Sequence, residues 1–347
     1  MNGNKERPVY AWEDAAPSLK EIFAGKLRIG AAVNTWNLAG DSPERKTILK
    51  QFNVLTLENE SKPGPVQPEE GRFVFGPLDR FAAFGEENGI RLRGHTLVWH
   101  SQVPAWFFED ADREKLLARM RTHISTVISR FRGRIAVWDV VNEVLKDGGG
   151  LRESLWYKIA GEDYIAEAFR AAREADPDAR LIINDYNLES VDAKAETMAS
   201  LVDRLRRADV PVDGIGLQMH LGPDTDLGRL KANVRKLTAL RSAWPDLKLE
   251  VTELDVSAYR FGDPAEDIDW TEEREKALGE RYAALFRFYL ELAEEGALDS
   301  VVFWGLHDGV SWLNGFPRRH RNYPLLIGRE LKLKQAFFDV AALASEK

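Results

Sequence analysis

The sequence predicts one α/β domain, a single (β/α)8 TIM barrel in which eight parallel strands alternate with helices. Short runs rich in apolar and β-branched residues recur eight times along the chain, and stretches with helical periodicity separate them. Strands that alternate with helices pair in parallel, and eight such units suffice to close a barrel. No linker-like stretch interrupts the pattern, so residues 1–347 are predicted to form one domain.

The predicted strands are residues 27–33, 54–58, 91–98, 135–142, 181–185, 214–220, 247–254 and 300–306. Helical periodicity is clear at 116–131 and 164–175, and the second helix should end before Asp176 and Pro177. Two long segments, 257–270 and 308–324, follow the last two strands. Because barrel active sites are built from the loops after the strands, we expect both segments to border the functional rim.

Composition excludes several classes of protein. Hydrophobic residues make up 44% of the chain and charged residues 30%, which is typical of a globular protein rather than a disordered one. The net charge of -8 is spread over interleaved acidic and basic residues, which argues against nucleic-acid or anionic-membrane partners. A neutral or cationic ligand fits better.

Metal sites, disulfides and targeting segments are not predicted either. The chain has no cysteine, and its 6 histidines form no His-x-x-x-His pair, so we expect no metal and no cofactor. The first ten residues lack the apolar stretch of a signal peptide, and no run approaches the ~18 apolar residues of a membrane span. This predicts a cytoplasmic protein, although a removed leader would leave the same sequence.

Polar and aromatic side chains gather where the predicted strands end. All strand ends of a barrel converge on one rim, and burying polar groups there costs free energy unless they are paired. One such residue alone is more often structural, as we expect for His123 and for the basic run 318–321. The joint placement instead predicts a functional rim, made of Glu58, Asn59, Lys62, His95, Trp99, Asn142, Glu143, Tyr186, Gln218, His220, Glu253, Asp255, Trp304 and Trp312.

Two glutamates of this set form a candidate catalytic pair. Glu143 and Glu253 end the fourth and seventh strands, nearly opposite each other in an eight-stranded ring. Cleavage of a glycosidic bond needs one acid that protonates the leaving oxygen and one carboxylate that attacks or activates water. Strand alternation also places His220 where it could bridge Glu253 and Asp255 and keep Glu253 ionised.

The aromatic residues indicate the ligand. Trp99, Trp304, Trp312 and Tyr186 combine flat apolar faces with hydrogen-bonding edges, which suits the C–H faces and hydroxyl groups of sugar rings. Ten tryptophans are many for one chain, and several fall at strand ends rather than in helical stripes. A polysaccharide cleft explains this placement.

At these residues the sequence resembles glycoside hydrolase family 10, a xylanase family. The matching stretches are 58–62, 93–102, 138–143, 184–187, 214–220, 251–255, 304–305 and 311–312. The resemblance implies an endo-β-1,4-xylanase that retains anomeric configuration by double displacement, with Glu143 as acid/base and Glu253 as nucleophile. It also implies that Asn142 binds the 2-hydroxyl at the cleavage site and that His220 with Asp255 orients Glu253.

The resemblance further implies roles in substrate binding. Gln218, His95, Lys62, Trp99 and Trp304 would line the subsite of the cleaved sugar; Glu58, Asn59 and Trp312 would hold the next sugar on the non-reducing side; Tyr186 would face the leaving group. Trp304 and Trp312 would crowd out a hydroxymethyl group and so favour xylose over glucose. The loop 312–317 and the lack of a carbohydrate-binding module resemble the intracellular branch of the family, whose substrate would be xylan or imported xylo-oligosaccharides.

Two other functions stay open at this point. A related barrel glycosidase could act on another β-linked glycan, such as β-1,4-glucan. A non-catalytic xylan-binding barrel could keep both glutamates for structural reasons. The sequence does not determine the oligomeric state.

Overall fold

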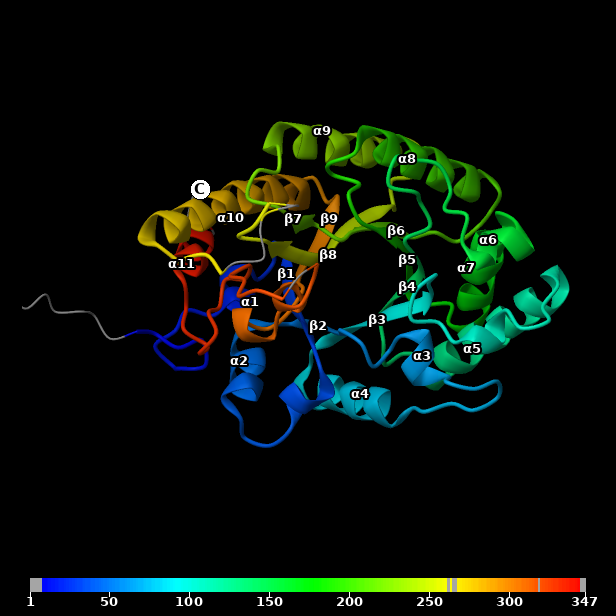
Figure 1. The fold of residues 1–347 in the computed structure, drawn as a ribbon, viewed down its shortest axis with the longest axis horizontal. Helices are drawn as coiled ribbons and strands as arrows, with labels where there is room; N and C mark the ends of the chain where they lie inside the picture. The colour runs from blue at the N-terminus through cyan, green and yellow to red at the C-terminus, as the bar shows by residue number, and fades with distance from the viewer. Residues whose placement is uncertain (1–7, 261–262, 264–266, 318, 344–347) are drawn as a thin grey trace, which may run out of the picture.

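A computed structural model of the protein describes residues 8–260, 263, 267–317 and 319–343. Parallel strands close into a central barrel, and helices surround it (Figure 1). The predicted (β/α)8 barrel is therefore confirmed. Parts of the long segments 257–270 and 308–324, and of the basic run 318–321, lie outside the described residues.

Eight strands form the barrel, and each pairs in parallel with its neighbours. The closure runs through the pairing of β1 with β9 and of β6 with β8. The bounds agree with the predicted strands to within about three residues at either end. The strands are β1 (Arg28–Val33), β2 (Val54–Leu57), β3 (Arg91–Val98), β4 (Val137–Asn142), β5 (Arg180–Asp185), β6 (Gly214–Leu217), β8 (Lys248–Val256) and β9 (Leu298–Phe303).

The sixth strand differs from the prediction. It was expected to run from 214 to 220 without a break, but β6 ends at Leu217 and a separate two-residue strand, β7 (His220–Leu221), follows. Met219 has a left-handed backbone, with φ of 61°, which takes the chain out of the regular ladder. His220 then pairs with Asp255 on β8. The short detour carries His220 to the rim beside the end of β8.

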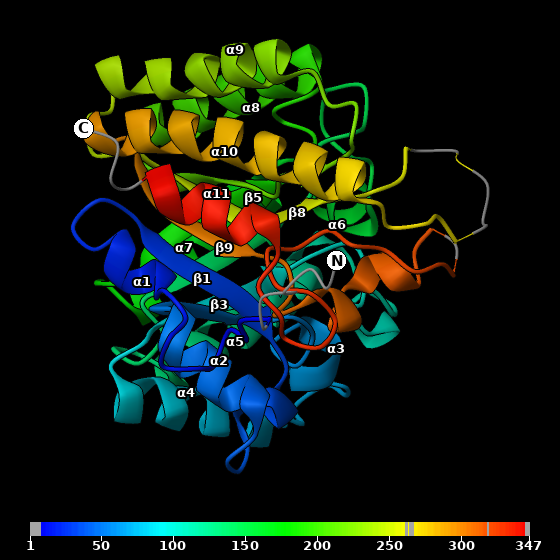
Figure 2. The same ribbon diagram turned by 90° about the vertical axis from the view of Figure 1, so that its left-hand side faces the viewer.

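Helices pack around the barrel and hold the strand ends in register. Figure 2 shows α8, α9 and α10 along one side and α2 and α4 along the opposite side, with α11 beside α10. The principal helices are α2 (Pro43–Gln51), α4 (Gly76–Asn88), α5 (Arg113–Arg130), α7 (Asp163–Ala175), α8 (Asp192–Arg207), α9 (Leu227–Thr238), α10 (Glu272–Glu294) and α11 (Gln335–Leu343). Shorter helices are α1 (Leu19–Ile22), α3 (Pro63–Val66) and α6 (Leu155–Ala160).

Local signals set the helix boundaries. The helix predicted at 116–131 begins slightly earlier, because the side chain of Asp112 accepts a hydrogen bond from the backbone N–H of Lys115 at 2.9 Å and caps α5. The helix predicted at 164–175 ends at Ala175, directly before Asp176 and Pro177, as expected. No helix among the described residues is long and apolar enough to cross a membrane.

Candidate active site

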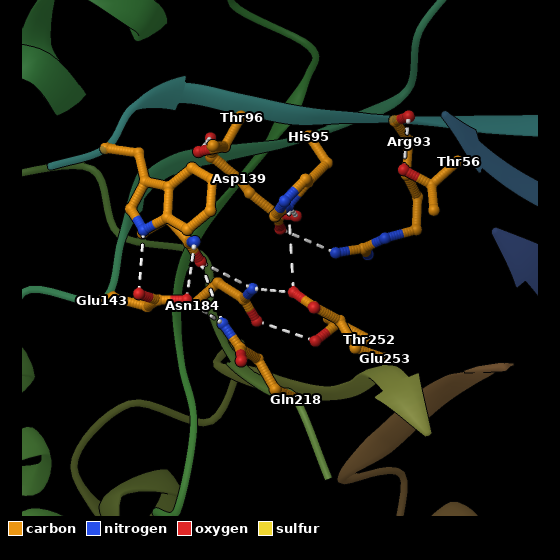
Figure 3. Close-up of polar contacts among 12 residues, drawn as sticks. Thr56, Arg93, His95, Thr96, Asp139, Glu143, Asn184, Gln218, Thr252 and Glu253 are labelled. Carbon is orange, nitrogen blue, oxygen red and sulfur yellow. Dashed lines mark hydrogen bonds and ion pairs between the residues drawn. The ribbon is translucent and has the colours of Figure 1, made fainter. Parts of the chain in front are cut away.

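Glu143 lies directly after β4 and points across the rim. Its backbone is left-handed, with φ of 57°, and its N–H donates to the carbonyl of Asn184 at 2.9 Å. The indole Nε1 of Trp99 donates to Glu143 Oε2 at 2.9 Å, and the amide of Gln218 donates to Oε1 at 3.2 Å (Figure 3). A carboxyl group held by two neutral donors in this way keeps a fixed orientation.

Glu253 lies on β8, almost fully buried, and two donors hold its carboxylate. Asn184 Nδ2 donates to Oε1 at 2.7 Å, and His220 Nε2 lies 3.1 Å from Oε2. Burial alone would raise the pKa of Glu253, but the hydrogen bond from His220 and the charges of His95 and His220 outweigh it and lower the pKa below its ordinary value. Glu253 is therefore an anion at neutral pH.

His220 bridges two carboxylates, as the sequence predicted. Its Nδ1 lies 3.0 Å from Asp255 Oδ1, and Trp312 Nε1 donates to the other oxygen of Asp255 at 2.8 Å. Burial opposes a charge on the imidazole, but Asp255 and Glu253 prevail and raise the pKa of His220 to about 10. Both ring nitrogens then carry protons at neutral pH and donate to the two carboxylates.

Asn184, at the end of β5, connects the surroundings of the two glutamates. Its Nδ2 donates to Asn142 Oδ1 at 2.9 Å as well as to Glu253, and its Oδ1 accepts from the hydroxyl of Thr252 at 2.7 Å. A Cβ at Gly216 on β6 would lie 2.2 Å from Asn184 Oδ1, so glycine is required there for this amide to keep its place. Asn142 also accepts from Gln218 at 3.3 Å.

The residues after β2 form a charged cluster at one side of the pair. Lys62 Nζ donates to Asn59 Oδ1 at 3.0 Å and lies 5.1 Å from the ring centre of Trp99. Burial lowers the pKa of Lys62, and the charges of Glu253, Glu58 and Glu143 oppose that change. Burial also raises the pKa of Glu58, although Asn34 donates to its carboxylate at 3.1 Å.

Aromatic and imidazole rings surround the nucleophile candidate. Trp304 packs edge-on against His95 with 5.2 Å between ring centres, and Trp312 packs against His220 at 5.0 Å. Tyr186 lies farther out: its hydroxyl accepts from Arg152 Nη2 at 2.7 Å and donates to Asp147. Every site residue predicted from the sequence thus lies on the same rim of the barrel.

Four residues that lie beside or below the predicted set were given no site role from the sequence. Asn184, Asp139 and Arg93 lie below or between the glutamates, and Arg152 donates through Nε to the backbone carbonyl of Glu143 at 2.9 Å. The sequence did contain a signal for Arg93, because a charged residue inside an otherwise apolar strand needs a buried partner. Asn184 occupies a strand end, but its contacts depend on side-chain direction across three strands.

The described residues form no cluster of metal ligands. In that part of the chain, no three or more His, Asp or Glu side chains are grouped so that they could hold a metal ion. The site instead combines an anionic carboxylate, a second carboxylate held by neutral donors, and hydroxyl-binding amides between aromatic rings. A barrel rim equipped in this way has the groups required for glycosidic bond cleavage.

The comparison with known proteins identifies the family. A family model described as glycosyl hydrolase family 10 matches residues 18–343, and the chain belongs to this family. It is 41% identical to endo-1,4-beta-xylanase C of Paenibacillus barcinonensis over 94% of this chain and 32% of that protein. It is 39% identical to the endo-1,4-beta-xylanase of Geobacillus stearothermophilus over 93% of this chain and 98% of that protein.

A solved structure shows the same fold. TsXylA, an intracellular xylanase from Thermoanaerobacterium saccharolyticum solved as a glutamate-to-alanine mutant with xylotriose, superposes with a TM-score of 0.86 at 38% identity. The match covers 94% of this chain and 99% of that chain. The chain spans about a third of the length of the xylanase C of P. barcinonensis.

Proposed function

We propose that the chain is an endo-1,4-β-xylanase that hydrolyses internal β-1,4-xylosidic bonds of xylan or xylo-oligosaccharides by double displacement. The observation that carries this proposal is the environment of Glu253. Two donors, the positively charged His220 and the neutral amide of Asn184, orient its carboxylate. Glu253 is thus held as an anion in an almost fully buried position. A nucleophile requires that state before substrate binds.

The proposed mechanism has two steps. Glu253 attacks the anomeric carbon while Glu143 donates its proton to the leaving oxygen, which forms a glycosyl-enzyme on Glu253. Glu143, now a carboxylate, takes a proton from water as this water attacks the anomeric carbon and releases Glu253. Retaining enzymes hold the two carboxyl groups ~5 to 5.5 Å apart, and we expect that separation here.

The other residues have proposed roles in holding the sugar chain. Asn142 would bind the 2-hydroxyl of the cleaved sugar. The subsite of that sugar would be lined by Gln218, His95, Lys62, Trp99 and Trp304. The next sugar on the non-reducing side would be held by Glu58, Asn59 and Trp312, and Tyr186 would face the leaving group. The xylotriose bound by TsXylA supports a short xylo-oligosaccharide as ligand.

Two measurements test this proposal. Glu143→Ala and Glu253→Ala should each reduce hydrolysis of xylohexaose by several orders of magnitude yet leave oligosaccharide binding in place, as calorimetry would show. If neither change lowers the rate, the assignment of Glu143 and Glu253 is wrong. A wild-type protein that binds xylohexaose without hydrolysing it would be a xylan-binding barrel. Proton NMR of the first product should show the β-anomer, whereas an initial α-anomer would indicate inversion.

The proposal also covers substrate preference and cellular location. Turnover of xylo-oligosaccharides should exceed that of cello-oligosaccharides of equal length, because Trp304 and Trp312 leave little room for a hydroxymethyl group; the reverse order would favour a glucanase. We also propose that residues 1–347 act as one domain inside the cell, which the similarity to the intracellular TsXylA supports. Fractionation of the producing cells would test the location.

A further inference from the structure

Charged side chains of alternating sign fill the barrel below the nucleophile. Starting at the N-terminal ends of the strands, Asp299 Oδ2 lies 2.8 Å from Arg180 Nη1, which lies 3.0 Å from Glu250 Oε1. Glu250 also faces Arg93, whose Nη2 lies 2.8 Å from Asp139 Oδ1. We call Asp299, Arg180, Glu250, Arg93 and Asp139 the charge column.

The upper end of the column reaches the active site. Asp139 Oδ2 lies 3.0 Å from His95 Nδ1, and the same nitrogen lies 3.9 Å from Glu253 Oε1 (Figure 3). Arg93 and His95 are two residues apart on β3, so both point into the barrel. His95 also pairs with Asp139 in the ladder between β3 and β4. An ionised Asp139 only accepts hydrogen bonds, so His95 Nδ1 carries the proton between them.

Arg93 and Asp139 have little contact with water. Their side chains are 2% and 3% exposed, so each charge depends on its partners for stabilisation. Arg180 and Asp299, at the far end of the column, are 24% and 19% exposed and can exchange part of their interaction for water. The two ends of the column therefore differ: one meets solvent and the other meets His95 and the nucleophile.

We propose that Arg93 is a positioning residue for the nucleophile. It orients Asp139 so that this carboxylate receives the Nδ1–H of His95, and its positive charge compensates the negative charge of Asp139 beside Glu253. The inference rests on the proposed role of Glu253 as nucleophile. Arg93 itself touches neither substrate nor reacting atoms. It acts on Glu253 through Asp139 and His95, which lie below the carboxylate.

Several charged groups act on Glu253, and only one of them would change in the test. His220 faces it from β7, Asp255 from β8, Lys62 from the segment after β2, and Glu143 from directly after β4. The remaining contributions come from below through His95, Asp139 and Arg93. Removal of Arg93 leaves the first group intact and exposes Glu253 to the uncompensated charge of Asp139.

The test is the pH dependence of kcat/KM on xylohexaose for Arg93→Met. Hydrolysis requires ionised Glu253, so its pKa defines the acidic limb of the profile. An uncompensated carboxylate nearby raises that pKa, and the acidic limb should move upward by about one pH unit or more. Arg93→Met/Asp139→Asn should return the limb to its wild-type position, because the extra negative charge is gone.

Arg180→Met is the matched control. It removes a column arginine with two ion pairs of similar length, but at the solvent end and away from His95. It should lower the melting temperature and leave the acidic limb unchanged. Should Arg93→Met prove too unstable to purify, Arg93→Gln keeps a donor for Asp139, removes the charge and makes the same test.

The outcomes separate the two proposals. A shift of the acidic limb in the Arg93 variant but not in Arg180→Met supports the inference. If the acidic limb of the kcat/KM profile lies at the same pH in the wild type and in both variants, Arg93 only stabilises the barrel. That result overturns the inference. If the wild-type protein itself fails to hydrolyse xylohexaose, the proposed function fails, independently of Arg93.

Discussion

Asn184 has a fixed amide orientation between the two candidate catalytic glutamates. The anion of Glu253 only accepts hydrogen bonds, so Asn184 Nδ2 must face it as a donor, and Asn184 Oδ1 then accepts from the hydroxyl of Thr252 at 2.7 Å. A flipped amide would place an oxygen against the anion of Glu253. The residue therefore both orients Glu253 and keeps it ionised, which a side chain of similar size but different charge would not do.

Changes at Asn184 should reveal both effects. Asn184→Ala removes a hydrogen bond to a charged group, and kcat/KM on xylohexaose should fall roughly 10- to 100-fold. For Asn184→Asp, kcat/KM should be lower still. Its acidic limb should also move to higher pH, because a second carboxylate beside Glu253 raises the pKa of Glu253. Steady-state kinetics between pH 4 and 8 measure both quantities.

Thr252→Val provides the comparison for this pair. It frees the amide of Asn184 to rotate without adding a charge, so its loss of kcat/KM should be smaller than that of Asn184→Ala and its acidic limb unchanged. A wild-type rate for Asn184→Ala would mean that His220 alone suffices to orient Glu253.

At this scale the sequence identified residues whose chemical type and strand-end position coincide, such as Glu143 and His220. It did not identify Asn184 or Arg93, for different physical reasons. The contact of Asn184 depends on a glycine at 216 on the neighbouring strand, which leaves room for its amide. Arg93 lies in the interior of a strand, where its partner Glu250 is distant in sequence.

A buried ion pair joins the end of β5 to α8. Lys194 Nζ lies 2.8 Å from Asp185 Oδ1, and neither side chain is exposed to solvent. Asp185 also accepts from the backbone N–H of Leu145, and Lys194 lies 3.6 Å from the ring centre of Tyr186. Burial raises the pKa of Asp185 to about 6, although Lys194 opposes this change. The pair thus fixes the loop that carries Tyr186.

Breaking this ion pair should destabilise the barrel where the end of β5 packs against α8. Lys194→Met leaves a buried carboxylate without its cation, which costs about 3 to 5 kcal/mol of unfolding free energy. Lys194→Met/Asp185→Asn removes both charges and should recover most of that loss. Urea unfolding of the wild type and of the single and double variants measures the difference. Equal stability of the single and double variants would show that the charge at Asp185 is not what destabilises the protein.

The end of α7 was predicted correctly because its cause is local: Pro177 prevents continuation of the helix. The start of α5 was predicted at 116, but Asp112 caps the helix and it begins at Arg113. The break between β6 and β7 has no such cause in the pattern, because an apolar Met219 continues the apparent strand while its backbone is left-handed. Tertiary pairing of His220 with Asp255 determines this break, and only the folded barrel brings those residues together.

Two histidines, one buried and one partly exposed, give the whole molecule opposite responses to pH. His123 lies in the core with Nδ1 2.8 Å from Gln67 Oε1, and burial lowers its pKa to about 4. His220 is the reverse case, since Asp255 and Glu253 overcome burial and raise its pKa to about 10. In the unfolded chain both histidines titrate near pH ~6.5.

The free energy of unfolding should therefore decline on both sides of neutral pH. Below pH ~6.5 the histidine of the unfolded chain is protonated, whereas folded His123 stays neutral until about pH 4. The free energy of unfolding therefore falls by about 3 kcal/mol as the pH falls through that window. The stabilisation from His220 is complete below pH ~6.5 and is lost as pH rises towards 10. Urea unfolding at a series of pH values measures the profile.

Two variants separate these contributions. His123→Gln should flatten the acid side of the profile and leave the alkaline side as it is, whereas His220→Gln should do the opposite. An unchanged acid slope in His123→Gln would show that carboxylates, rather than this histidine, dominate acid unfolding.

The overall fold was predictable because its signal repeats. Eight apolar runs alternate with helical stretches, and each run needs cover on the outside of the sheet, which only a closed barrel with surrounding helices supplies evenly. The charged filling of the barrel was not predictable in the same way. No sequence pattern singled out Glu250 or Asp299, and the structure places both below the candidate site as partners of Arg180.

Trapping of the glycosyl-enzyme tests the central claim most directly. The protein would be incubated with a fluorinated xylobioside that carries an activated leaving group, and the modified peptide would be identified by mass spectrometry. Double displacement predicts one added xylobiosyl group per chain, located on Glu253, together with loss of activity. A protein that turns the reagent over without any adduct, or that carries the sugar on a residue other than Glu253, would contradict the account.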